Sequence, residues 1–237
     1  MTDSRTMSPV GAPEQRTPVS SRRWPIQAAA IGYSVAWIVG LLLTSSSTDV
    51  TSSGGAIVRE DAPQAAALTL QFLLTEGVAA LALLVVVIGF WRATARGWGR
   101  TVSVAAGISA VAISLSQTAL GVCLIEIAVR GANAALARSL TVDLNELDGV
   151  KMMLLAVMTF AVSSAQWRRQ VRLPIWLLPT GIATGVALVA SAIGYLSGSN
   201  AFAAAAWISL PLLLLFITTV GLCVRPRSER ATAEASR

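Results

Sequence analysis

The residues of this chain that could do chemistry inside an apolar environment are a single lysine and a glutamate far from any polar loop. Lys151 is the only lysine among eighteen basic residues, and it stands at the start of an apolar run. Glu76 lies within another apolar run. A buried ammonium or carboxylate must find a partner or reach water, because an unpaired charge in an apolar medium is costly. We therefore expect an ion pair or a polar cavity around these residues.

Helical spacing places these residues at one depth. Counted to the tryptophans that follow them, Glu76 is fifteen residues and Lys151 sixteen residues from the end of its apolar run. At about 1.5 Å per residue, both lie about 23 Å above the inner interface of a hydrocarbon core about 30 Å thick. We predict a polar layer in the outer third of a helix bundle. Its candidate residues are Glu76, Gln117, Asp148, Lys151 and Ser209.

Two interpretations of this layer follow from the residues. In the first, Glu76, Gln117 and Lys151 line a small outward-facing cavity that binds an ion, a proton or a polar head group. In the second, Lys151 extends its long side chain to the surface, or pairs with Asp148 three residues earlier on the same helix. Asp148 would then cap that helix, and a Glu76–Lys151 pair would only fix how two helices pack.

The composition assigns the chain to the membrane. Of its 237 residues, 54% are hydrophobic and only 13% are charged, which is too apolar for a protein covered by water. We expect an all-α, polytopic membrane protein with six transmembrane helices and both termini in the cytoplasm. A disordered tail over 1–23, a transmembrane domain over 24–224 and a cytoplasmic tail over 225–237 are expected. The six spans are predicted over about 25–44, 65–91, 102–129, 149–167, 174–196 and 201–224.

The basic residues predict the orientation of the bundle. Fourteen of the eighteen fall in the two tails and in the links after the second and fourth spans. Because basic loops stay on the cytoplasmic side, both termini are expected inside the plasma membrane. Five of the seven tryptophans fall at the same boundary, as in an interfacial aromatic belt.

Two outer connections are expected to differ in structure. The stretch over 45–63 is polar and slightly acidic, as in a flexible loop. In the stretch over 130–148, leucines recur at helical spacing, which predicts a short amphipathic helix at the outer interface, separate from the fourth span. These leucines are Leu136, Leu140, Leu144 and Leu147.

Small residues at regular spacing predict where helices pack closely. The first span has a small residue at every fourth position along one side, and the fifth span has the GxxxG pair Gly181 and Gly185. Without large side chains, two helix backbones can approach closely in a bilayer. The ridge of the first span consists of Ala28, Gly32, Ala36 and Gly40.

Residue types that are missing from the sequence narrow its chemistry. The chain has no histidine, which excludes bis-histidine haem, imidazole metal sites and Ser-His or Cys-His nucleophiles. Cys123 and Cys223 lie towards opposite faces of the membrane, too far apart for a disulfide. No phosphate-binding loop or acidic metal cluster occurs, so no cofactor and no metal are expected. Nucleic acid is not an expected partner, because no basic stripe with interleaved aromatic residues is present.

Four short segments carry a resemblance to known sequences. They are LTEG in the second span, LNELDGVKM at the start of the fourth, RLPIWL at the start of the fifth and ISLPLLLLF in the sixth. With the six-span layout over about 24–224, the chain resembles a group of uncharacterised bacterial integral membrane proteins. The resemblance implies the fold and a bacterial cell-membrane location. It implies no activity, so Glu76, Asp148 and Lys151 are carried over as motif positions without a role.

Three classes of function fit these observations. The lack of recognisable catalytic groups favours a non-enzymatic membrane protein, such as a scaffold, a sensor or an accessory subunit. Its expected partners are the lipid bilayer and either another membrane protein or a second copy of the chain. The first alternative is a small transporter or an ion- or proton-conducting protein that uses Glu76, Gln117 and Lys151. The second is a membrane-embedded lipid or isoprenoid enzyme with Glu76 as general acid.

Overall fold

The computed structural model describes residues 24–44, 52–131 and 133–224. Within these ranges the chain is helical and has no strand. Six segments are long and apolar enough to cross a membrane, which indicates a multi-pass membrane protein. The tails expected over 1–23 and 225–237 lie outside the described residues.

The six segments are built from long helices, and the second segment changes its helical type along its length. In that segment, η2 is a turn of 3-10 helix and η3 a stretch of π-helix within an otherwise continuous helical run. The elements are α1 Trp24–Leu42, α2 Gly54–Asp61, η2 Ala62–Gln64, α3 Ala65–Phe72, η3 Leu73–Val78, α4 Ala79–Ala93, α5 Trp98–Arg130, α6 Ala134–Trp167, α7 Leu177–Ser197, α8 Asn200–Ala203 and α9 Ala206–Cys223.

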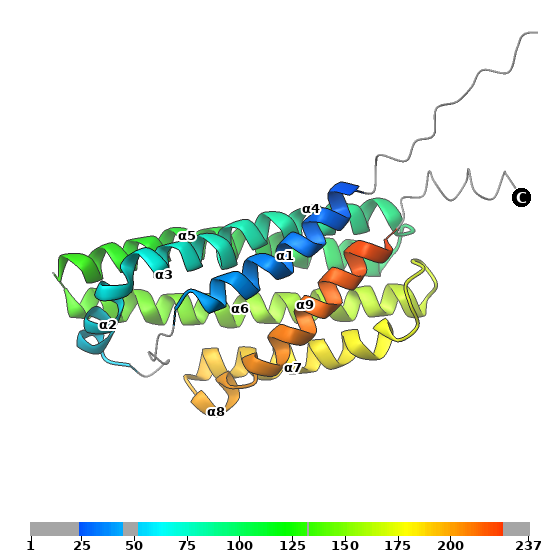
Figure 1. Ribbon diagram of the computed structural model, residues 1–237. Coiled ribbons are helices and arrows are strands. Elements are labelled where there is room, and N and C mark those ends of the chain that lie inside the picture. Colours follow the sequence, from blue (N-terminus) through cyan, green and yellow to red (C-terminus); the bar gives the residue numbers. More distant parts are fainter. Residues whose placement is uncertain (1–23, 45–51, 132, 225–237) are drawn as a thin grey trace, which may run out of the picture.

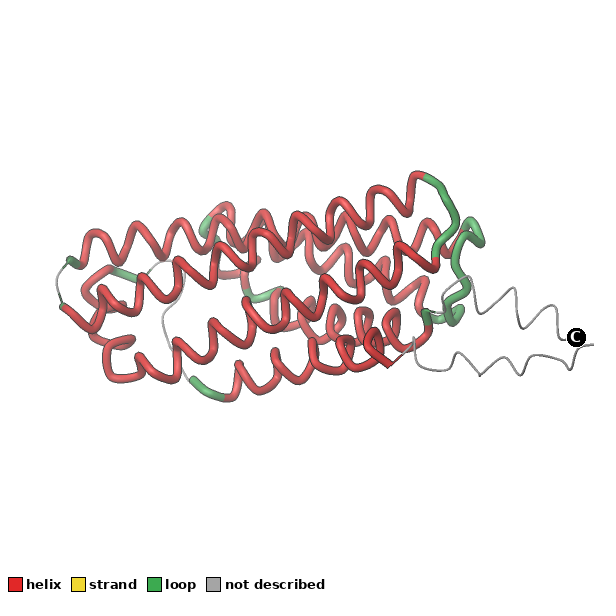
Figure 2. The backbone as a smooth tube through the Cα atoms, turned by 90° about the horizontal axis from the view of Figure 1, so that it is seen from above, coloured by secondary structure: helices red, strands yellow, loops and turns green. Residues whose placement is uncertain are grey.

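The long helices form a ring in chain order. Contacts join α1 to α4, α4 to α5, α5 to α6, α6 to α7, α7 to α9, and α9 back to α1 (Figure 1). Figure 2 shows that the helices run along one common direction. We name the two ends of the bundle by their contents: the proximal end holds the start of α1 and the end of α9, and the distal end holds α2 and α8.

The ring is filled with side chains in its proximal half. Phe90 and Phe216 belong to a large buried cluster there. Gly221 of α9 lies so close to α1 and α4 that a Cβ atom at this position would meet Ala30 and Val86. Because α4 also contacts α9 across the ring, no central helix is needed at this level. The distal half lacks this convergence, which leaves room inside the bundle.

The chain around the predicted start of the fourth span forms one long helix. The sequence predicts a separate interfacial helix before that span, but α6 is continuous over 34 residues. Asn133 begins it by accepting a hydrogen bond from the backbone N–H of Leu136 at 3.1 Å. Leu144, which the prediction places on the membrane surface, is buried in a second cluster with Ile57 and Leu124. This packing across α2, α5 and α6 explains why the helix extends beyond the apolar run.

Part of the loop predicted over 45–63 also folds as a helix. Ser53 accepts a hydrogen bond from the backbone N–H of Ala56 and caps α2 at its start. Gly54 then packs against the backbone of Ala134 and the side chain of Arg138 on α6. The distal end is therefore closed on one side by α2, and the prediction of a flexible loop is wrong for 54–61.

The proximal end carries the aromatic and basic residues expected at a membrane interface. Arg100 stacks over the ring of Trp91, with 3.9 Å from its Cζ atom to the ring centroid. The α4–α5 and α6–α7 connections and the adjoining helix ends contain six arginines and no acidic residue. The five tryptophans predicted at this boundary are all exposed at helix ends: Trp24, Trp91, Trp98, Trp167 and Trp176.

The small-residue patterns have mixed outcomes. Gly181 and Gly185 are both buried against neighbouring helices, which confirms the close packing predicted for them. In the ridge of α1, Ala36 and Gly40 are buried, but Gly32 faces open space. The ridge prediction is therefore correct only for the distal half of α1, because Ala30 and Tyr33, rather than Ala28 and Gly32, are buried in its proximal half.

Candidate functional site

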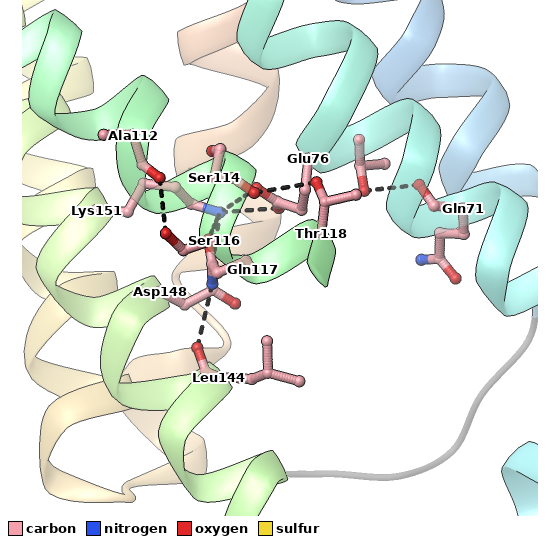
Figure 3. A network of polar contacts seen from close by, with 11 residues as sticks. Gln71, Glu76, Ala112, Ser114, Ser116, Gln117, Thr118, Leu144, Asp148 and Lys151 are labelled. Atoms are coloured by element: carbon pink, nitrogen blue, oxygen red, sulfur yellow. Dashed lines mark hydrogen bonds and ion pairs between the residues drawn. The ribbon is translucent and has the colours of Figure 1, made fainter. Parts of the chain in front are cut away.

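Lys151 is the centre of a buried polar network (Figure 3). Its side chain comes from α6, and the residue is only 4% exposed. The Nζ atom lies 2.8 Å from both carboxylate oxygens of Glu76, 2.8 Å from Oε1 of Gln117 and 2.7 Å from Oδ1 of Asp148. The sequence leaves open whether Lys151 meets Glu76 or Asp148, and the structure shows that it meets both.

The lysine has no N–H left for another molecule. An ammonium group has three N–H donors, and Glu76, Gln117 and Asp148 supply three acceptor groups. Gln117 is held in the matching orientation because its Nε2 donates a hydrogen bond to the carbonyl of Leu144 at 3.2 Å. Its oxygen therefore faces the ammonium. The positive charge is fully used inside the protein.

Two structural interpretations of Lys151 and Asp148 are wrong. Lys151 does not extend its side chain to the surface, because it is buried and held by three helical segments. Asp148 does not cap the fourth span, because it lies well inside α6. Both corrections follow from the extension of α6 towards the distal end, which moves the helix start away from the apolar boundary.

A π-helical turn positions Glu76. In η3 the backbone N–H of Ala79 reaches the carbonyl of Leu74, five residues back instead of four. A π turn holds an extra residue, so it changes which side chains face inward. Two consecutive residues of η3, Thr75 and Glu76, are buried. Thr75 is held by a 2.9 Å hydrogen bond from its hydroxyl to the carbonyl of Gln71. Segments of this kind frequently occur at functional sites.

The network faces a cavity of about 680 Å³ in the distal half of the ring. This volume lies within the usual range for small-molecule sites, roughly 300–1,000 Å³. Polar side chains line its middle and distal parts together with apolar ones such as Ile57, Phe72 and Leu124, and four leucines close it towards the proximal half. These leucines are Leu83, Leu155, Leu188 and Leu213.

The charges on the cavity wall do not cancel. When Glu76 and Asp148 are both ionised, Lys151 offsets only one of these two carboxylates, so the network then has one negative charge in excess. Asp61, at the end of α2, lines the same cavity and is only 7% exposed. Its carboxylate has no hydrogen-bond or ion-pair partner among the described residues. The atoms of the charged groups that can still bind a ligand in the cavity are therefore carboxylate oxygens.

Ser209 lies in the cavity wall but outside the network. Its hydroxyl is 3.1 Å from that of Ser191, so these serines join α9 to α7. The structure thus brings together four of the five predicted site residues and places the fifth elsewhere on the same cavity. Glu126 pairs with Arg130 on the exposed surface of α5, away from the cavity.

Several cavity residues are missing from the sequence prediction. Asp61 is overlooked because it falls in a segment interpreted as a solvated loop. The only two tyrosines of the chain, Tyr33 and Tyr195, both line the cavity. Their rarity is the one signal in the sequence that could have drawn attention to them. Asn145 also lines the cavity, one helical turn before Asp148.

Among the described residues, no group of three or more histidine, cysteine or acidic side chains could hold a metal ion. Cys123 and Cys223 are both free thiols, as the sequence predicts. Comparison with protein-family models, with curated proteins and with solved structures gives no match to this chain.

Proposed function

We propose that the protein is a small membrane transporter that binds a cation in the distal cavity. The observation that carries this proposal is the excess of carboxylate on the cavity wall. Lys151 uses all its N–H donors within the network. The carboxylate of Asp61 and one oxygen of Asp148 accept no hydrogen bond from it. An unpaired charge is costly in an apolar bundle, and a bound cation would offset it.

Closure of the cavity at one end supports transport by alternating access. Leu83 lines the distal cavity and also a second cavity of about 20 Å³ nearer the proximal end. This leucine and its neighbours separate the two spaces in the described conformation. A small displacement of α4 against α9 would join them, which is the kind of movement that transport requires.

The orientation of the bundle belongs to the same proposal. Basic connections and exposed tryptophans gather at the proximal end, so we place that end, with both termini, on the cytoplasmic side of a bacterial plasma membrane. The cavity then takes its cation from the outer side. A scaffold or accessory subunit has no need of such a cavity. A general acid at residue 76 is disfavoured, because both oxygens of Glu76 accept hydrogen bonds from Lys151.

Uptake by the full chain in liposomes tests the proposal. The probes are radioactive sodium, rubidium and tetramethylammonium, each measured against liposomes without protein. We expect saturable uptake of at least one probe. Asp61→Asn and Asp148→Asn should each weaken its uptake by about tenfold or more, because a buried carboxylate that contacts a cation is worth more than about 1.4 kcal/mol.

Glu126→Gln is the matched control for these variants. It also removes one acidic charge from the distal part of the bundle, but its side chain is exposed and outside the cavity. Uptake by this variant should equal that of the parent protein. The proposal is overturned if none of the three cations is taken up, or if the three carboxylate variants behave alike.

A further inference from the structure

Helices α1 and α9 run side by side and are in contact in the proximal half of the bundle (Figure 1). At this contact, the hydroxyls of Ser34 and Thr218 lie 2.6 Å apart, and Thr218 also donates to the carbonyl of Ala30 at 3.3 Å. Further along, Gly40 of α1 packs on Thr75 of η3. The neighbouring helices thus draw the distal parts of α1 and α9 apart.

The distal part of α9 is held by α7. Ser209 of α9 bonds to Ser191 of α7, so this end of α9 is held away from α1. The distal cavity reaches into the space between the distal parts of α1 and α9, which we call the wedge. Its lining there is apolar and comes from both helices: Trp37 and Leu41 from α1, and Trp207 and Leu210 from α9.

The residues at the wedge face two environments. Leu41 is 38% exposed and Trp207 is 78% exposed, although both also line the cavity. Since α1 and α9 belong to segments that are long and apolar enough to cross a membrane, we expect their exposed sides to contact lipid. The cavity wall and the lipid-facing surface therefore share the same side chains at this place. A molecule dissolved in the bilayer would meet the cavity here before it met water.

We infer that the ligand is an amphiphile with a positively charged amino head group, and that it enters the cavity sideways from the lipid between α1 and α9. This inference rests on the proposed cation site. The carboxylates of Asp61 and Asp148 match the head group, and the floor of leucines matches a hydrocarbon chain. A small cation without a hydrocarbon chain would still bind the carboxylates, but more weakly, because it leaves that apolar floor without a partner.

Three probes of related structure test the ligand class. They are dodecyltrimethylammonium, tetramethylammonium, which lacks the chain, and dodecyl sulfate, which has the same chain and an anionic head. Binding to the full-length protein in nanodiscs is measured by calorimetry, with empty nanodiscs as blanks. We expect saturable binding of dodecyltrimethylammonium, at least about tenfold weaker binding of tetramethylammonium, and no saturable binding of dodecyl sulfate. Asp61→Asn should weaken the binding of dodecyltrimethylammonium.

A cross-link across the wedge tests the route of entry. In a Cys123→Ala, Cys223→Ala background, Leu41→Cys with Leu210→Cys is joined by a bismaleimide. Ser34→Cys with Thr218→Cys is the matched control, since it links the same helices where they already touch. The first cross-link should slow the association of dodecyltrimethylammonium by about tenfold or more and leave tetramethylammonium unchanged. The control cross-link should change neither.

The outcomes separate the inference from the proposed function. Equal affinity for the ammonium compounds with and without the chain overturns the amphiphilic ligand, and equal effects of the two cross-links overturn lateral entry. Both results leave the cation site standing. Binding of dodecyl sulfate as tight as that of dodecyltrimethylammonium overturns the cationic ligand class. Binding of the ammonium compounds that is insensitive to Asp61→Asn overturns the proposed cation site itself.

Discussion

At the scale of the residue, the network around Lys151 is asymmetric. The single ammonium is shared by two carboxylates, so loss of the lysine and loss of one carboxylate should affect the stability of the protein differently. Removing Lys151 leaves Glu76 and Asp148 buried near each other with no positive charge. Removing the charge of Glu76 leaves Lys151 with Asp148 and Gln117. Loss of the lysine should therefore be the more damaging change.

A double-mutant cycle tests this asymmetry. Lys151→Met should lower the free energy of unfolding by about 3–5 kcal/mol, because it leaves uncompensated buried carboxylates. Glu76→Gln should lower it by about 1–2 kcal/mol, since one charged acceptor remains. The double variant should be less destabilised than the sum of the two by roughly 0.5–3 kcal/mol. Unfolding by dodecyl sulfate in mixed micelles gives the three values, and simple additivity would contradict direct coupling.

At the scale of the element, the π turn and the long α6 place the site. The shift in backbone register at η3 brings Glu76 inward, and nothing in the hydropathy of LTEG signals such a turn. The extension of α6 carries Asp148 and Asn145 into the cavity wall as interior residues of a helix. It is stabilised by contacts with α2, which itself places Asp61 on the same wall. The docking of α2 is thus a structural requirement of the cavity.

Two adjacent glycines test the docking of α2. A Cβ atom at Gly54 would overlap the backbone of Ala134, whereas one at Gly55 would meet nothing within 4 Å. Gly54→Ala should displace α2 and increase amide hydrogen exchange over 54–61. Gly55→Ala should leave exchange unchanged or slow it, because alanine favours a helix by about 1 kcal/mol over glycine. Equal exchange in the two variants would show that α2 does not depend on this contact.

At the scale of the whole molecule, a ring of helices in chain order produces a bundle that is packed at one end and hollow at the other. The proximal half closes because α1, α4 and α9 converge on small residues. The distal half stays open because α1 and α9 follow different neighbours. Basic residues and tryptophans mark the packed end, so orientation and cavity access are linked.

Accessibility to a membrane-impermeant maleimide in intact cells tests this orientation. In the cysteine-free background, Ser199→Cys places a thiol in the connection between α7 and α8 at the distal end, and Arg96→Cys places one between α4 and α5 at the proximal end. The first should react in intact cells and the second only after permeabilisation, if basic connections stay inside. The reverse pattern would invert the proposed direction of access.

The sequence by itself determined the helices that are long and apolar enough to cross a membrane and the common depth of Glu76 and Lys151, because hydropathy and helical rise are properties of single segments. Only the tertiary structure decided that Lys151 meets both carboxylates, that Asp61 joins them and that a cavity lies beside them. These facts depend on how far helices stand apart, and Glu76 and Lys151 are 75 residues apart in the chain. The separation of α1 from α9 is set by contacts with third helices, which no local pattern in either segment records.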